Sequence, residues 1–324
     1  MMRWMCVSGL LLTSCGGGED SGGMRGRVRV DGSSTVFPIT EAVAEEFLKV
    51  HPRVQVTVGI SGTGGGFKKF SAGETDINDA SRPIKPIEQE AAKAGSVQFI
   101  ELPVAYDGIS VVANPENEFL DFLTVEELRK IWQPGSMVNK WSDIRSEWPD
   151  RQLNLYGPGT DSGTFDYFTE AVNGKSQVCR PDFTASEDDN VLVQGISGDP
   201  DALGFFGFAY YAENTSRLKL IPIDGGDGPV YPTHKTINQN TYKPLSRPVF
   251  IYVNDQARRE EVVAFVKFYL REAPNLVQEV GYVALPPEIY ELALHRFTNG
   301  ITGTVYGGGH AAGVSLLDLF QVGS

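Results

Sequence analysis

The stretch that decides the fold is residues 27–40, which read RVRVDGSSTVFPIT. Apolar and polar residues alternate over Arg27–Asp31, a pattern that predicts a strand. Pro38 suits the first turn of a helix, and the apolar positions beyond it continue at helical spacing. Gly32–Thr35 therefore form a turn, rich in hydroxyl groups, between a strand and a helix.

The same unit recurs along the chain. A second alternating strand is predicted over Val54–Ile60, followed by a glycine-rich run and a short helix over Phe67–Ala72. A third is predicted over Leu153–Tyr156, again followed by glycines, hydroxyl residues and a helix. Further short strands are predicted at 76–80, 97–104 and 203–210. Alternation of strands and helices predicts an α/β fold.

The length and two apolar runs predict a two-lobed molecule. A chain of 324 residues exceeds one small core. Gly108–Asn114 and Arg247–Asn254 are candidate strands that cross between lobes, so the first lobe contains both ends of the chain. Ligands of such folds bind in a cleft between lobes, at the carboxyl ends of strands. The predicted divisions are 27–105 for the first part of lobe 1, 106–246 for lobe 2 and 247–324 for the return to lobe 1.

The three strand-to-helix loops share one chemistry. The amides of a first helical turn are unpaired and favour negative charge, and serine and threonine hydroxyls donate further hydrogen bonds. Three such loops that converge would surround a tetrahedral oxyanion. The alternative for each loop is an ordinary helix N-cap. The candidate ligand-binding residues are Ser34, Thr35, Ser61, Thr63, Asp161, Ser162, Gly163 and Thr164.

Two charged positions could refine this site. Arg82 follows a predicted strand closely and offers a planar cation to an oxyanion, the alternative being a surface salt bridge. Asp161 or Asp79 could accept the proton of monohydrogen phosphate, a hydrogen bond that fully ionised sulfate cannot make. The sequence does not choose between the two aspartates.

The N-terminus has the properties of an export signal. Residues 1–15 read MMRWMCVSGLLLTSC, and their apolar run is too short to span a bilayer. Leu12–Cys15 resembles a bacterial lipoprotein cleavage box. The resemblance implies a signal peptide over 1–14, lipid attachment at Cys15 and a flexible tether over 15–26. The alternative is an ordinary signal peptide with a chance cysteine.

Composition excludes several classes of function. The net charge of −13 argues against nucleic acid and against electrostatic docking on anionic lipid. Three cysteines without a CxxC spacing, and four scattered histidines, give no metal motif. We therefore expect no metal, no cofactor and no catalytic residues.

Four stretches together resemble the periplasmic phosphate-binding proteins of ABC phosphate transporters. They are Asp31–Thr40 (DGSSTVFPIT), Gly59–Phe70 (GISGTGGGFKKF), Gly73–Ile84 (GETDINDASRPI) and Tyr156–Phe168 (YGPGTDSGTFDYF). The resemblance implies a hinged, type II-like binding protein, a monomer, that takes phosphate to a membrane permease from the periplasm or the outer face of the cytoplasmic membrane. By position, it implies phosphate contacts from Ser34, Thr35, Ser61, Ser162, Gly163 and Thr164.

The chain departs from the best-known branch of that family at two positions. Pro158 lies where the branch has an arginine, and Arg82 lies where it has an aspartate. We hypothesise that Arg82 supplies the missing cation from the opposite lobe. Alternative functions are a binding protein for another oxyanion, a phosphate sensor or scavenger, and a hydrolase that uses Ser162. The hydrolase would need a base, and no histidine lies in a suggestive context.

Overall fold

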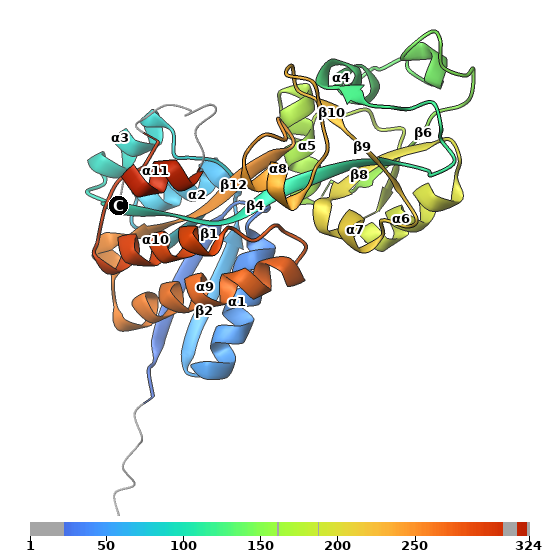
Figure 1. The fold of residues 1–324 in the computed structure, drawn as a ribbon. Coiled ribbons are helices and arrows are strands. Elements are labelled where there is room, and N and C mark those ends of the chain that lie inside the picture. The colour runs from blue at the N-terminus through green and yellow to red at the C-terminus, as the bar shows by residue number, and fades with distance from the viewer. Residues whose placement is uncertain (1–22, 161, 187, 307–315, 323–324) are drawn as a thin grey trace, which may run out of the picture.

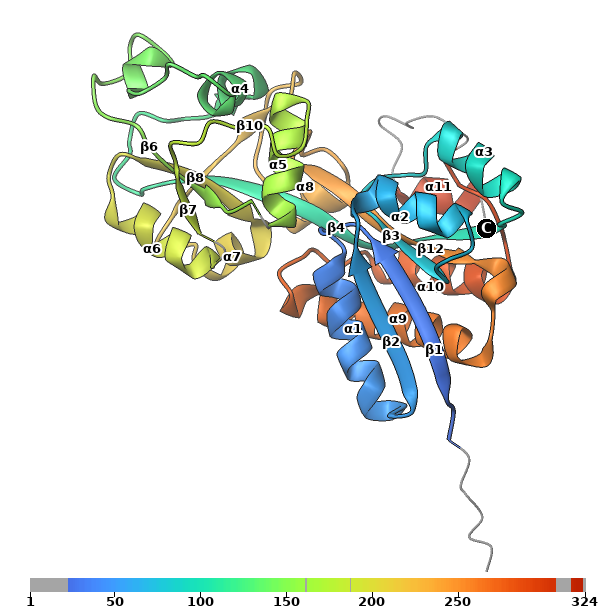
Figure 2. The same ribbon diagram turned by 180° about the vertical axis from the view of Figure 1, so that it is seen from behind.

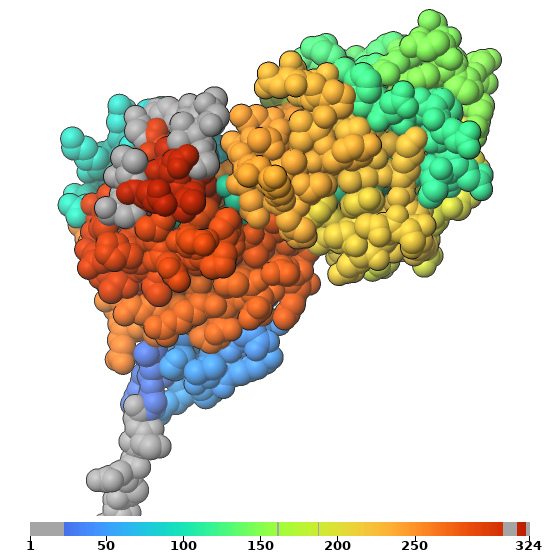
Figure 3. Space-filling model, in the orientation of Figure 1, coloured from blue at the N-terminus to red at the C-terminus, as the bar shows by residue number. Residues whose placement is uncertain are grey.

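The computed structural model describes residues 23–160, 162–186, 188–306 and 316–322. They form two α/β lobes joined side by side (Figure 1). A space-filling view shows the lobes as two masses joined side by side (Figure 3). The two-lobed α/β architecture predicted from the sequence is confirmed.

The first lobe begins as alternating strands and helices. Strands β2, β1 and β3 lie side by side and run parallel, so their carboxyl ends meet at one edge. Alternating valines of β1, Val28 and Val30, are buried, as the periodicity predicts. The elements are β1 (Gly26–Gly32), α1 (Phe37–Val50), β2 (Val54–Ile60), α2 (Gly62–Ser71), β3 (Ile77–Ala80) and α3 (Pro86–Ala94).

Two long strands connect the lobes. β4 (Phe99–Ala113) is buried along its whole length. Its first part pairs antiparallel with β12 (Ser246–Asn254), and residues 109–113 pair with β8 of the second lobe. β12 also pairs with β3, so the crossing strands lie within the same sheet as the parallel strands (Figure 2).

The second lobe extends that sheet through β8, β6 and β7. A small three-stranded sheet, β11-β10-β5, lies beside it. The elements are β5 (Leu123–Thr124), α4 (Val125–Trp132), η1 (Trp141–Asp143), β6 (Asn154–Pro158), α5 (Gly163–Asn173), β7 (Thr184–Ser186), α6 (Asp189–Gly198), β8 (Ala202–Gly207), α7 (Phe208–Glu213), β9 (Lys219–Ile221), β10 (Ile223–Asp224), β11 (Pro229–Val230) and α8 (His234–Asn238).

After β12 the chain returns to the first lobe. Phe265 of α9 packs edge-on against Phe47 of α1, with ring centroids 5.3 Å apart. Such aromatic pairs add to the stability gained from burial of the rings. The remaining elements are η2 (Asp255–Ala257), α9 (Glu260–Glu279), α10 (Pro287–Thr298) and α11 (Leu316–Val322).

Four local predictions are wrong. Residues 97–104 and 108–114 are not two strands, because β4 runs unbroken through Tyr106–Gly108. The glycine-rich run after β2 is the first turn of α2, where close packing on β1 and β3 offsets the low helix propensity of glycine. Residues 208–210 belong to helix α7, not to a strand. α9 continues past Arg271, through Pro274, to Glu279.

No helix within the described part of the chain is long and apolar enough to cross a membrane. The predicted signal peptide, the tether and Cys15 lie almost wholly outside the described residues, which begin at 23.

Candidate functional site

The turn after β1 is the first wall of the site. Gly32 has φ +147°, and a side chain there would collide with the Asp79 carbonyl. The Ser33 amide donates to that same carbonyl at 3.0 Å, and Ser33 Oγ accepts from the Thr35 amide at 3.2 Å. These bonds fix the turn at the carboxyl end of β1, where Ser34 and Thr35 face the second lobe.

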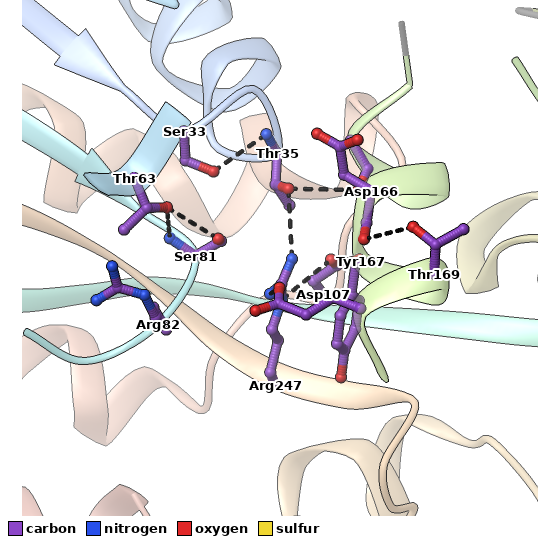
Figure 4. Close-up of polar contacts among 12 residues, drawn as sticks. Ser33, Thr35, Thr63, Ser81, Arg82, Asp107, Asp166, Tyr167, Thr169 and Arg247 are labelled. Atoms are coloured by element: carbon purple, nitrogen blue, oxygen red, sulfur yellow. Dashed lines mark hydrogen bonds and ion pairs between the residues drawn. The ribbon is translucent and has the colours of Figure 1, made fainter. Parts of the chain in front are cut away.

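The N-terminus of α5 is the opposite wall. Thr35 Oγ1 donates to the Gly163 carbonyl at 3.4 Å, and Ser34 Oγ donates to Asp166 Oδ2 at 3.2 Å. Figure 4 shows Thr35 and Asp166 facing each other from the two lobes. A Cβ on Gly163 would lie 2.6 Å from the Thr35 Cα, so the two backbones approach too closely for any other residue. The structure therefore brings the predicted residues of the first and third loops together across the two lobes.

Ser162 has the ordinary role that the sequence left open. Its Oγ accepts from the Thr164 amide at 3.2 Å, so it is the N-cap of α5. The dipole of this eleven-residue helix still favours negative charge near Gly163. Asp161, the predicted neighbour of Ser162, lies outside the described residues.

The loop before α2 lies on the first lobe, at the same edge of the sheet. Thr63 Oγ1 bonds to Ser81 Oγ at 3.0 Å and accepts from the Ser81 amide at 3.2 Å. Ser61 instead donates to Asp31, whose other oxygen accepts from Lys69 at 2.6 Å. Thr63 therefore lies beside a residue that lines the cavity between the lobes, whereas the Ser61 hydroxyl is engaged within its own lobe.

Arg82 is held by a carboxylate of its own lobe. Its two terminal nitrogens donate to the two oxygens of Glu88, each at 2.8 Å. Glu88 also accepts from the Lys85 amide at the start of α3. This bidentate pair is the geometry preferred by arginine and carboxylate, and it occupies the guanidinium without an anion. In this structure Arg82 therefore forms a salt bridge, which was the alternative to a role in binding an oxyanion.

Arg247 lies where the lobes and the crossing strands meet, and sequence reasoning missed it. Its Nη2 donates to Thr35 Oγ1 at 3.4 Å, and its Nη1 lies 3.3 Å from Glu170 of α5. The guanidinium covers the ring of Tyr167, with Cζ 3.7 Å from the centroid. Arg247 therefore contacts both walls of the site (Figure 4).

Asp107 is the strand partner of Arg247, on β4. It is 2% exposed, and its Oδ2 lies 3.7 Å from Arg247 Nε. Burial raises the pKa of Asp107 to about 6, and the Arg247 charge opposes that rise. The carboxyl is therefore ionised at neutral pH.

Asp79, one of the two predicted proton acceptors, has a different environment. It is fully buried, and burial, together with the Asp31 carboxylate, raises the pKa of Asp79 to about 8. A carboxyl that keeps its proton at neutral pH is a hydrogen-bond donor, so Asp79 is poorly suited to accept a proton from phosphate.

A cavity of about 400 Å³ opens beside these residues, between the lobes and the crossing strands. It is lined by Ser81, Arg82, Pro83, Tyr106, Tyr167, Glu170, Ala171, Asn240, Pro244, Ser246, Arg247, Pro248, Tyr306 and Leu316. Among the described residues, no group of histidine, cysteine or acidic side chains could hold a metal ion. Its charged lining consists of two arginines, Arg82 and Arg247, and one carboxylate, Glu170.

Comparison with known proteins identifies the family. The model of the PBP superfamily domain matches residues 17–273. The chain is 36% identical to the phosphate-binding protein PstS of Staphylococcus aureus, over 91% of this chain and 92% of that protein. The chain belongs to the family of phosphate-binding proteins within the PBP superfamily.

Two further proteins are similar over most of the chain. The protein SphX of Synechocystis sp. is 47% identical, with 91% of this chain and 89% of SphX covered. A solved structure from Planctomyces limnophilus, described as a possible phosphate-binding protein, is 49% identical. It matches with a TM-score of 0.83 over 86% of this chain and 99% of that one. The resemblance stated from the sequence and the type II binding-protein fold are both confirmed.

Proposed function

We propose that this binding protein captures inorganic phosphate between its lobes and delivers it to the permease of an ABC-type importer. The observation that carries the proposal is the meeting of Thr35 with the N-terminus of α5. Backbone amides, hydroxyls and a helix dipole from opposite lobes form there a set of neutral donors for a tetrahedral anion. The PstS relative is itself named a phosphate-binding protein.

The proposal also assigns the ligand contacts. In the proposal the anion lies against Ser34 and Thr35 on one side and Ser162, Gly163 and Thr164 on the other. Contacts of the bound anion with both lobes would hold the lobes together. Release of the anion would let the lobes move apart about the crossing strands. Thr63 adds a hydroxyl from the first lobe through its contact with Ser81.

Titration calorimetry of the purified chain with phosphate, sulfate and molybdate tests the ligand. We expect a strong signal with phosphate and none of comparable affinity with sulfate. Tight sulfate binding without a phosphate signal would contradict the proposal in favour of another oxyanion. Permease and ATPase genes adjacent to the gene would support transport over a sensor or scavenger role.

The lipid anchor is a separate part of the proposal. We propose that Cys15 carries lipid and that residues 15–26 tether the lobes outside the cytoplasmic membrane. Cells that produce a Cys15→Ser variant should release the protein from the membrane fraction, and the variant should no longer incorporate labelled fatty acid. Unchanged membrane retention and labelling in the variant would rule out Cys15 as the anchor.

A further inference from the structure

Arg247 and Asp107 are joined by strand register. They are directly paired across β12 and β4, the two strands that connect the lobes. Because successive residues of a strand face opposite sides of the sheet, paired residues share a face. The pair therefore lies at a fixed place in the junction, next to Thr35 of the first lobe and Tyr167 of the second.

Both members of the pair have unmet hydrogen-bonding capacity. Asp107 Oδ2 and Arg247 Nε are buried, and neither makes a hydrogen bond within the described residues, because they lie 3.7 Å apart. A buried donor or acceptor without a partner costs free energy, so such groups normally have one. A bound group that accepts from the arginine and donates to the aspartate would satisfy both.

The tyrosines near Asp107 do not meet this need. Tyr167 donates its hydroxyl proton to the Pro244 carbonyl at 2.6 Å, and Tyr282 donates to the Thr35 carbonyl at 2.7 Å. The only cation paired with Asp107 in the described chain is Arg247. The carboxylate therefore keeps an acceptor site free beside a guanidinium.

Monohydrogen phosphate has the matching chemistry. Its ionised oxygens accept hydrogen bonds from a guanidinium, and its P–OH group donates one to a carboxylate. Sulfate has the same shape and charge but has no hydrogen to donate, so its oxygen would face the unpaired acceptor. The difference in affinity between the two anions would then come from one carboxylate.

We propose that Arg247 is the cation that binds phosphate in this protein and that Asp107 accepts the P–OH hydrogen, so that the pair selects phosphate over sulfate. The inference rests on the proposed function. It assigns the cation to the crossing strand β12 and not to Arg82, whose guanidinium is already paired with Glu88. It also assigns the acceptor role that the sequence left between Asp161 and Asp79.

Calorimetry on Asp107→Asn tests the acceptor. We expect the ratio of phosphate affinity to sulfate affinity to fall at least about tenfold, the factor for one hydrogen bond to a charged group. Asp150→Asn is the matched control, because it makes the same change at a carboxylate that is paired with Lys140 outside the cavity and is 71% exposed. We expect this control to keep the wild-type ratio. A wild-type ratio in Asp107→Asn would overturn the role of Asp107.

A test on the ligand side needs no variant. Monofluorophosphate is a dianion of phosphate shape without a P–OH hydrogen. The wild-type protein should bind monofluorophosphate at least about tenfold more weakly than phosphate, because the hydrogen bond from P–OH to Asp107 is lost. Equal affinity would overturn the acceptor role even if Asp107→Asn failed to fold.

Single substitutions at Arg247 and Arg82 distinguish the roles of the two arginines. Arg247→Ala should lose at least about tenfold in phosphate affinity, and Arg82→Ala should lose clearly less. Arg247→Lys, which keeps the charge without the bidentate fork, should lie between wild type and Arg247→Ala. A large loss in Arg82→Ala with none in Arg247→Ala would overturn the assignment. Failure of the wild-type protein to bind phosphate would instead contradict the proposed function itself.

Discussion

Two buried aspartates on strands of one sheet differ in charge because their neighbours differ. Asp79 forms no ion pair within the described residues and lies near the Asp31 carboxylate, so burial keeps it protonated near neutral pH. Asp107 is paired with Arg247, which limits the rise of its pKa to about 6. Asp79, as a neutral carboxyl, is therefore a buried residue of the core. Asp107, as a carboxylate, can accept a hydrogen bond from a ligand.

The raised pKa of Asp79 has a consequence for stability. The unfolded chain releases this proton near the ordinary value of 3.8, whereas the folded chain keeps it until about 8. Stability should therefore fall as pH rises across that window. Asp79→Asn cannot titrate, so its melting temperature should fall less than that of the wild type between pH 5 and pH 8. Equal slopes for the two proteins in thermal unfolding would contradict the assignment.

The sequence predicts single candidate binding residues more readily than pairs of residues that are distant in the chain. Ser34, Thr35 and Gly163 can be predicted as candidates because each lies in a short loop whose composition indicates its chemistry. Arg247 and Asp107 are 140 positions apart in the chain, and only the register of β4 against β12 brings them together. A weak signal existed, since each is a charged residue at the edge of an apolar run predicted to cross between lobes.

At the scale of elements, α5 and the turn before α1 meet through backbone contact. Gly163→Ala places a methyl group where the Thr35 backbone now lies, so the helix and the turn must move apart. We expect phosphate affinity to fall about tenfold or more, with little change in melting temperature because each lobe keeps its own core. Gly198→Ala is a matched control, since a Cβ there meets nothing within 4 Å. Unchanged affinity in Gly163→Ala would show that this contact is not needed for binding.

The predicted elements failed where tertiary packing outweighed local pattern. Tyr106–Gly108 looked like a break between strands, but these residues are buried at the lobe junction and continue β4. Gly66 is predicted to be part of an anion-binding loop. A Cβ at this position would lie 2.0 Å from Asn78 Oδ1, so a glycine is needed here for α2 to pack against the sheet. Local composition does not report either constraint.

For the whole molecule, a ligand that bridges two lobes stabilises the folded chain. At a phosphate concentration of one hundred times Kd, the free energy of unfolding should rise by about 2.7 kcal/mol. This corresponds to a rise of several degrees in melting temperature. Sulfate at the same concentration should give a much smaller rise, and equal shifts with the two anions would contradict selective binding.

The most direct test is a crystal structure of this chain grown with phosphate. We expect a tetrahedral anion beside the contact of Thr35 with the N-terminus of α5, with its oxygens against Arg247 and one oxygen within hydrogen-bond distance of Asp107. An anion bound elsewhere, or one in the cleft with no contact to the opposing lobe, would contradict the convergence of the two loops on a single phosphate site.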